Sequence, residues 1–180
     1  MTKPSDRELI QAVLAGEKTD FARLYDRYGP LVRAICYDTT RNLTDAQDLA
    51  QDVFIRAYEK SDHLRDPDCF GKWVVGIARL RCREWRRQRS QSRDKHSGLE
   101  DAEPAIANPS NDGRIEQLRE MITALPEKER LALHTFYLQG KSAEVARRIM
   151  GLSRSGFYRV LDRARKRLEY LLVKEREDIR

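Results

Sequence analysis

GKSAEVARRIMGLSRSGFYRVLDRARKRL, residues 140–168, carries the pattern that decides the fold of the second half of this chain. Ser142 is placed to cap a short helix, because its hydroxyl can accept from the free amides of the first turn. Gly151 allows the left-handed backbone that ends many helices, and Ser153 is placed to cap a second helix. We therefore predict two consecutive helices joined by a tight turn.

The second of these helices has one apolar stripe and one basic surface. The residues spaced three and four apart that form the stripe are Phe157, Val160, Leu161, Ala164 and Leu168. The candidate DNA-binding residues on the other faces are Ser153, Arg154, Ser155, Tyr158, Arg159, Arg163, Arg165 and Lys166. The pattern favours a helix-turn-helix that meets duplex DNA, although a solvated helical hairpin has the same pattern. Other parts of the chain must decide between these two interpretations.

Composition indicates a basic globular protein with charge unevenly spread. The 180 residues are 40% hydrophobic and carry a formal net charge of +6, which favours a polyanionic partner and allows one modest core or two small ones. Acidic residues dominate residues 38–68, whereas residues 72–95 are strongly basic. This asymmetry suggests two kinds of partner surface.

Cysteine and histidine usage favours neither a metal site nor a disulfide framework. The three cysteines have no CxxC spacing, and the three histidines are scattered, so we expect no metal and no cofactor. We expect the cysteines to be buried or half-buried thiols. The N-terminus lacks an apolar signal segment, and no run approaches the roughly 20 apolar residues of a transmembrane helix. We therefore expect a cytoplasmic protein without membrane insertion.

Helical periodicity predicts an all-α first half. Ser5 and Glu8 have the spacing of a capping box, and a second helix starts near Thr19, with a further helical stretch after Gly29-Pro30. Another capping box is predicted at Thr44 and Gln47, followed by a helix whose inner face is Leu49, Val53, Phe54, Ala57 and Tyr58. A long helix is expected from Cys69 to Arg89.

The middle of the chain reads as a linker between two helical domains. Residues 89–113 are rich in Ser, Pro, Asn and Gly without apolar periodicity, which favours a flexible connection. Beyond it, Asn111 or Asp112 is placed to cap a helix, and Pro126 suits the first turn of the next. We therefore predict domains at residues 1–88 and 114–180, the second containing the helix-turn-helix.

Several motifs in this order resemble the extracytoplasmic-function (ECF) group of bacterial RNA polymerase sigma factors. The motifs are DAQDLAQDVFIRAYEK (residues 45–60), then Phe70, Trp73, Ile77, Ala78 and Arg79, then LPEKER (residues 125–130) and SRSGFYRVLDRARKRL (residues 153–168). The resemblance covers nearly the whole chain and implies a subunit that joins core RNA polymerase and directs initiation at specific promoters.

The resemblance assigns core-polymerase binding to the acidic helix. The residues concerned are Asp45, Asp48, Gln51, Asp52 and Phe54, which would dock on the coiled-coil clamp of the large polymerase subunit. An acidic surface would complement a basic partner and repel DNA, which gives the acidic segment of a basic protein a purpose. Without the resemblance, an ordinary solvated helix face explains the same residues.

The resemblance also assigns the minus-ten promoter element to the helix from Cys69 to Arg89. Its candidate DNA-binding residues are Lys72, Arg79, Arg83, Arg86 and Arg87. Together with the loop of residues 61–68 they can hold a flipped base and track a single strand. Trp73 falls on the apolar stripe and is expected in the core, whereas Trp85 suits packing or base stacking equally. Leu80 stands where the family often has Asn.

The helix-turn-helix would read the minus-thirty-five element. It departs from the family at Gly156-Phe157-Tyr158, where a small Thr or Val pair followed by Lys is usual. The spacing from Ala146 to Gly151 is five rather than the usual four, so either Arg147 takes the alanine position or the turn carries an extra residue. The linker would thread near the active centre and the RNA exit path, or serve as an inert tether.

Two other function classes compete with this interpretation. A stand-alone helix-turn-helix transcriptional regulator would bind duplex DNA without polymerase, usually as a dimer. An enzyme is the third class, but the sequence has no phosphate-binding Gly-rich loop followed by Lys, no HExxH and no nucleophile elbow, so we predict no catalytic residues. By resemblance alone, the partners would be core RNA polymerase, promoter DNA and an anti-sigma factor.

Overall fold

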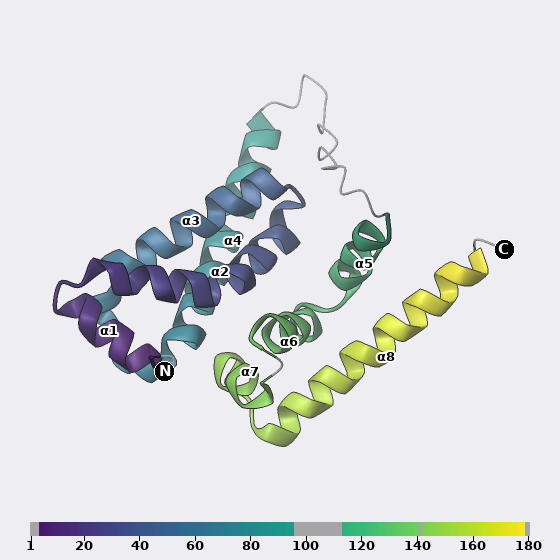
Figure 1. Cartoon of the computed structure of the whole chain (residues 1–180). Helices are drawn as coiled ribbons and strands as arrows, with labels where there is room; N and C mark the ends of the chain where they lie inside the picture. The colour runs from purple at the N-terminus through teal and green to yellow at the C-terminus, as the bar shows by residue number, and fades with distance from the viewer. Residues whose placement is uncertain (1–3, 96–112, 141, 179–180) are drawn as a thin grey trace. The chain divides into compact units, whose positions relative to one another are not determined.

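The computed structural model describes residues 4–95, 113–140 and 142–178, and every regular element in these ranges is helical. The chain divides into two compact units, the first containing α1 to α4 and the second α5 to α8 (Figure 1). The predicted all-α fold with two small helical units is confirmed. Within the described ranges, no helix combines the length and the apolar character that a membrane crossing needs.

The first unit begins with α1 (Asp6–Leu14), whose start is fixed by the predicted capping box. Ser5 N donates to Glu8 Oε2 at 2.6 Å, and Glu8 N donates to Ser5 Oγ at 3.3 Å. Gly16, with a φ of 102°, then turns the chain into α2.

Helix α2 (Lys18–Thr40) runs through Pro30 without a break, so the predicted division at Gly29-Pro30 is wrong. Buried Tyr28 and Leu31 flank the proline, while Pro30 itself is exposed. The packing of these neighbours holds the helix together across the one hydrogen bond that proline cannot donate.

Helix α3 (Leu43–Glu59) starts earlier than the sequence predicts. Arg41 adopts a left-handed conformation, and the side chain of Asn42 accepts from Asp45 N at 3.1 Å. The predicted capping box at Thr44 and Gln47 is therefore wrong, because the helix has already begun there.

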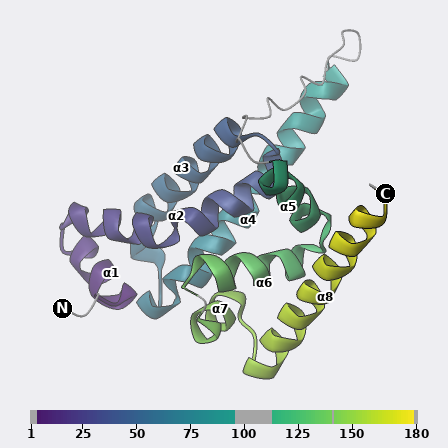
Figure 2. The same cartoon turned by 45° about the vertical axis from the view of Figure 1, so that its right-hand side comes forward.

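Two short 3-10 turns, η1 (Ser61–His63) and η2 (Pro67–Cys69), lead from α3 into α4 (Phe70–Lys95). Helix α4 thus continues into the range predicted as linker, and residues 96–112 of that range lie outside the described residues. Figure 2 shows α3 and α4 packed along α2 within this unit.

Aromatic rings fill the core of the first unit. Phe21 makes edge contacts with Phe54 and Phe70, with centroids 6.4 and 6.3 Å apart, and Tyr28 lies 5.4 Å from Phe70. These contacts join α2, α3 and α4 around one centre, and offset or edge-on rings are the favoured geometry.

Two of the three cysteines lie in this core. Cys36 and Cys82 are buried on α2 and α4, whereas Cys69 is exposed, so the prediction of a buried or half-buried thiol is wrong for Cys69 alone. The hydrogen bond between Cys36 and Cys82, together with burial, raises the pKa of Cys36.

The second unit contains α5 (Gly113–Ala124), α6 (Glu127–Leu138), α7 (Ala143–Met150) and α8 (Arg154–Asp178). Its buried core consists of Leu125, Ala132, Leu133, Ala146, Phe157, Val160, Leu161 and Ala164. Arg130 joins α6 to the end of α5, because its Nη1 donates to Thr123 O at 2.9 Å and Leu125 O at 3.0 Å. The caps predicted at Asn111 or Asp112 lie outside the described residues, and Pro126 is the N-cap of α6.

Candidate nucleic-acid interface

Helix α3 presents a polar, acidic face to solvent. Asp48 and Gln51 are exposed one turn apart, and the Asp48 side chain has no hydrogen bond or ion pair with any described residue. Asp45 is half-buried, and its carboxylate lies 3.7 Å from Arg89 Nη1 of α4. Of the predicted acidic docking residues, Asp48 is therefore the one whose charge is fully available to a partner.

Phe54 does not belong to this face, so its prediction as a docking residue needs correction. Its side chain is only 4% exposed and lies 4.7 Å from Tyr25, centroid to centroid. The next residue, Ile55, is instead 50% exposed and follows Gln51 by one helical turn. We name the surface formed by Asp48, Gln51 and Ile55 the α3 face; it combines a charge, an amide and an apolar side chain.

Asp52 holds α3 against α4. Its carboxylate accepts from Arg81 Nε and lies 3.5 Å from Arg56 Nε, while Arg81 also donates to Glu84. Burial disfavours the charged form of Arg81, but the hydrogen bonds to Asp52 and Glu84 outweigh that penalty and raise its pKa. The negative charge of Asp52 is thus largely compensated by Arg81 and Arg56 within the unit.

Helix α4 carries a basic face along its length. The exposed side chains at helical spacing are Lys72, Arg79, Arg83, Arg86 and Arg87, as the sequence predicts. Gly76 lies between them, exposed and with no atom within 4 Å of where its Cβ would stand. These cations are placed to track a phosphate backbone.

The two tryptophans lie off the basic face. Trp73 is half-buried against Phe70, with centroids 5.9 Å apart. Trp85 follows Ala78 and Cys82 by seven and three residues, so it shares their inward side of α4, and Arg89 covers its ring at 5.1 Å. Of the two roles considered for Trp85, packing is the better supported.

The helix-turn-helix has the predicted caps. Ser142 Oγ accepts from Val145 N at 3.3 Å, Gly151 is left-handed with a φ of 64°, and Ser153 Oγ accepts from Gly156 N at 3.1 Å. A Cβ on Gly156 would stand 3.0 Å from Ser153 Oγ, so this glycine leaves room for the capping hydroxyl.

The structure decides between the two interpretations of the turn. Ala146 is fully buried in the core, whereas Arg147 is half-buried and pairs with Glu144 at 2.6 Å. Ala146 is therefore the packed alanine, and the chain takes one additional residue to reach Gly151. Phe157, at the position where the family usually has a small residue, is also fully buried.

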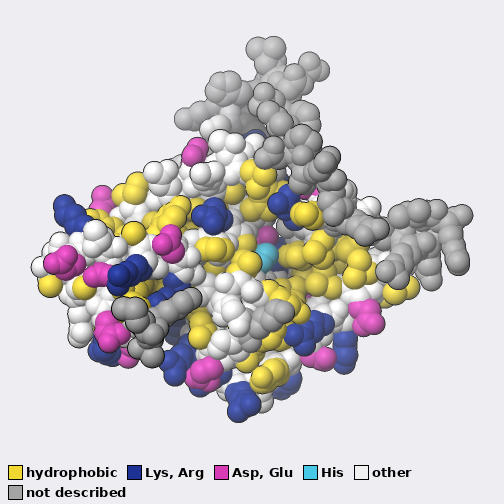
Figure 3. All heavy atoms as spheres, in the orientation of Figure 1, with side chains coloured by type: hydrophobic (Ala, Val, Ile, Leu, Met, Phe, Trp, Pro, Cys, Tyr) yellow, Lys and Arg dark blue, Asp and Glu magenta, His cyan; other side chains and the backbone are white. Residues whose placement is uncertain are grey.

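The outward face of α8 is basic with one acidic interruption. Its exposed residues at helical spacing are Arg154, Ser155, Tyr158, Arg159, Asp162, Arg163 and Lys166. We name these seven residues the α8 face. Figure 3 shows dark blue basic side chains mixed with acidic and hydrophobic ones over the beginning of α8.

Asp162 is a member of the α8 face that sequence reasoning missed. It lies 3.0 Å from Lys166 Nζ, so part of that predicted phosphate-binding charge is already compensated. A carboxylate in this place can accept from the N4 amine of cytosine, but it repels phosphate. Its spacing of four residues from Tyr158 could have placed Asp162 on the same face of the helix.

Arg165 is exposed at the edge of this face, seven residues after Tyr158, and its guanidinium turns toward α6. Its guanidinium is 5.4 Å from the centroid of Phe136 on α6, and Arg167 Nε lies 3.0 Å from the buried Glu129. These two arginines cover the sides of the core. That Arg165 meets DNA stays a prediction, with its guanidinium already in contact with Phe136.

Comparison with known proteins connects both units to one family. The family model for sigma-70 region 2 matches residues 24–92, which span most of α2 and continue into α4. The ECF RNA polymerase sigma factor SigM of Mycobacterium tuberculosis H37Rv is 26% identical over 168 residues, 93% of this chain and 85% of the relative. The ECF RNA polymerase sigma-E factor of Escherichia coli K12 is 29% identical over 174 residues, 86% of this chain and 90% of the relative.

Over most of its length the chain is similar to ECF RNA polymerase sigma factors, and residues 24–92 match sigma-70 region 2.

The chain spans only 40% of another relative, the probable RNA polymerase sigma factor RfaY of Xanthomonas campestris, at 29% identity. Among solved structures, CnrH in complex with the cytosolic domain of CnrY matches this chain with a TM-score of 0.67. That match has 24% identity and covers 95% of this chain and 99% of CnrH. RpoE of Bartonella quintana, in complex with the anti-sigma factor NepR, matches with a TM-score of 0.60 at 24% identity, covering 85% and 96% of the two chains. Both structures share the fold of this chain.

No cluster of three or more His, Cys, Asp or Glu side chains able to hold a metal ion occurs in the part of this chain that the structure describes.

Proposed function

We propose that this sigma factor binds core RNA polymerase through the α3 face and directs initiation by reading two promoter elements, without catalytic activity of its own. The observation that carries the proposal is the separation of charge within the first unit. Asp48 is exposed and unpaired among the described residues of α3, while α4 exposes a row of lysine and arginine side chains. One helix thus suits a basic protein partner, and the other suits nucleic acid.

Helix α4 and the loop of residues 61–68 before it are proposed to read the minus-ten element as it opens. The exposed Lys72, Arg79 and Arg83 would follow the phosphates of one strand, and the loop would receive an unstacked base. The α8 face is proposed to read the minus-thirty-five element as duplex DNA.

The family and the solved relatives support two further proposals about partners and place of action. CnrH and RpoE of Bartonella quintana are seen with CnrY and with the anti-sigma factor NepR, respectively. We propose that a comparable anti-sigma protein restrains this chain, and that the chain acts in the cytoplasm.

The proposed function is tested by in vitro transcription with purified core RNA polymerase on a library of randomised promoters. We expect the full-length protein to join the core enzyme and to select a discrete set of start sites. Binding to duplex DNA with no effect on the core enzyme would support the stand-alone regulator instead.

Arg159→Ala tests the α8 face directly. Arg159 is exposed between Tyr158 and Arg163, so we expect the change to weaken binding to minus-thirty-five duplex by about 1–3 kcal/mol if the side chain reads a base edge. Titrations against the selected duplex and against single-base variants measure the loss and its dependence on sequence.

Arg165→Ala is the matched control on the same helix, because the Arg165 guanidinium lies over Phe136. If Arg159→Ala and Arg165→Ala lose equal amounts of duplex affinity, whatever the DNA sequence, only the overall charge of α8 matters. An unchanged affinity for Arg159→Ala would remove Arg159 from the interface.

A further inference from the structure

The loop of residues 61–68 has little apolar burial to hold its shape. Ser61 is buried at its start, but no residue of the following 3-10 turn η2 is buried. Arg65 and Asp66 are exposed between the two turns. Polar contacts must therefore fix this loop in the position from which it leads into α4.

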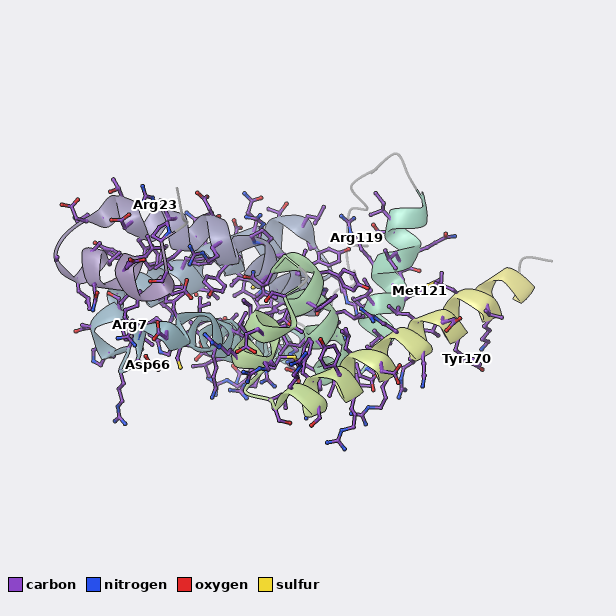
Figure 4. All side chains as sticks on the ribbon, turned by 60° about the horizontal axis from the view of Figure 1, so that its bottom comes forward. Arg7, Arg23, Asp66, Arg119, Met121 and Tyr170 are labelled. Carbon is purple, nitrogen blue, oxygen red and sulfur yellow. The ribbon has the colours of Figure 1, made fainter. Side chains whose placement is uncertain are left out.

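Arg7 of α1, about sixty residues earlier in the sequence, supplies those contacts. Its Nη2 lies 2.6 Å from Asp68 Oδ2 and 3.1 Å from Asp66 Oδ1, and its Nε donates to Asp68 Oδ2 at 3.1 Å. Figure 4 shows Arg7 and Asp66 as neighbours, with Arg23 apart from them. One planar guanidinium thus contacts two carboxylates, Asp68 through both Nε and Nη2 and Asp66 through Nη2, and lysine would have to replace these fixed, coplanar donors with a single mobile nitrogen.

Asp66 is also tied to the loop itself. Its carboxylate accepts from Asp68 N at 3.2 Å and from Cys69 Sγ at 3.3 Å. The bonds from Cys69 and from Asp68 N, followed by the contact with Arg7, lower the pKa of Asp66. Asp66 therefore connects the turn that starts α4 with the side chain that approaches it from α1.

Helix α1, which carries Arg7, is itself well anchored in the unit. Leu9 and Ile10 are almost completely buried, and the neighbouring Asp6 accepts from Tyr28 Oη at 2.5 Å and from Arg27 of α2. Consecutive residues thus bind two different parts of the unit, Asp6 the helix α2 and Arg7 the loop.

We propose that Arg7 is a positioning residue for the base-reading loop: it fixes residues 61–68 for an unstacked minus-ten base and offsets one of the two negative charges that Asp66 and Asp68 bring beside the promoter strand. This inference rests on the proposed function of the loop. Arg7 itself need not touch DNA. Without it, two carboxylates would face the phosphates on a loop free to move.

The test uses the full-length protein bound to core polymerase and a forked promoter fragment taken from the transcribed library. Single-base changes are placed at each exposed minus-ten position of the non-template strand. We expect Arg7→Ala to bind the best fragment about fivefold more weakly, the upper range of an exposed ion-pair contribution, and to discriminate less between bases. Affinity for core polymerase and for minus-thirty-five duplex should stay unchanged.

Arg7→Lys separates positioning from charge. Lysine keeps the positive charge but lacks the planar guanidinium. If Arg7 positions the loop, Arg7→Lys should therefore discriminate between bases as poorly as Arg7→Ala. Arg23→Ala is the matched control, since Arg23 is exposed and its one ion pair among the described residues is the local one with Asp20 at 3.1 Å. Hydrogen exchange of the amides of residues 62–69 in the free protein should accelerate in both Arg7 variants and stay unchanged in Arg23→Ala.

Wild-type discrimination in Arg7→Lys, or in Arg7→Ala, would overturn the proposal, as would an equal loss in Arg23→Ala. Failure of the wild-type protein to join core polymerase or to distinguish any base would instead contradict the proposed function. In that case, unchanged hydrogen exchange of residues 62–69 in the Arg7 variants would still show that Arg7 does not hold the loop in place.

Discussion

Phe157→Ala is expected to unfold the second unit and abolish its binding to duplex DNA, while the first unit stays folded. Phe157 is fully buried among the residues of the core cluster. Replacing such a ring by alanine costs about 3–5 kcal/mol through lost burial and the cavity that remains. A unit of this size has a total stability of only about 3–5 kcal/mol, so little of the folded form should survive.

The sequence offers a clean measurement of this result. Both tryptophans, Trp73 and Trp85, lie in the first unit, so their fluorescence reports on that unit alone. Phe157→Ala should therefore lose helical circular dichroism and minus-thirty-five binding while the tryptophan unfolding transition stays in place. Tyr158→Ala is the control, because this neighbouring ring is 46% exposed and its loss should weaken DNA binding without unfolding. Full helix content and wild-type duplex affinity in Phe157→Ala would contradict the assignment of the core.

Asp48→Arg is expected to weaken binding to core RNA polymerase by at least about tenfold, because a reversed charge would meet the basic partner proposed for the α3 face. Asp48 is exposed and makes no ion pair within the described residues, so the unfolding temperature should not fall. Ile55→Ala should act in the same direction through lost apolar contact. Titration of labelled core enzyme measures both variants.

Two controls make the result specific. Asp26→Arg places the same change of charge on an exposed site of a different helix, α2, and should leave core binding unchanged. Asp52→Asn should instead lower the tryptophan unfolding transition, because Asp52 pairs with Arg81 and Arg56 inside the unit. Equal losses of core affinity in Asp48→Arg and Asp26→Arg would reduce the α3 face to a general electrostatic effect.

Local hydrogen bonding made much of the fold predictable. Ser5, Ser142, Gly151 and Ser153 act through atoms only a few residues away, and all four cap or end helices as predicted. The amphipathic stripes likewise located the helices of both units. Two local predictions failed: Asn42, not Thr44, caps α3, and α2 continues through Pro30 where a division was predicted.

Features that depend on distant parts of the chain were harder to predict from the sequence. Helical periodicity predicted Phe54 on the inner face of α3, where the rings of α2 pack against it, but the family resemblance also made it a docking residue, a role that the adjacent, exposed Ile55 suits better. The spacing from Gln51 could have indicated Ile55. Nothing near Arg7 could have indicated its partners, which lie 59 and 61 residues away.

The bond between Asp52 and Arg81 restricts how this protein can be recombined with its relatives. A chimaera that takes α3 from one sigma factor and α4 from another exchanges only one member of the pair. Unless the donor supplies a matching charge, a half-buried arginine is left without its carboxylate, a costly state for a charged group. Modules for polymerase docking and promoter reading should therefore be exchanged together, with the boundary placed after α4.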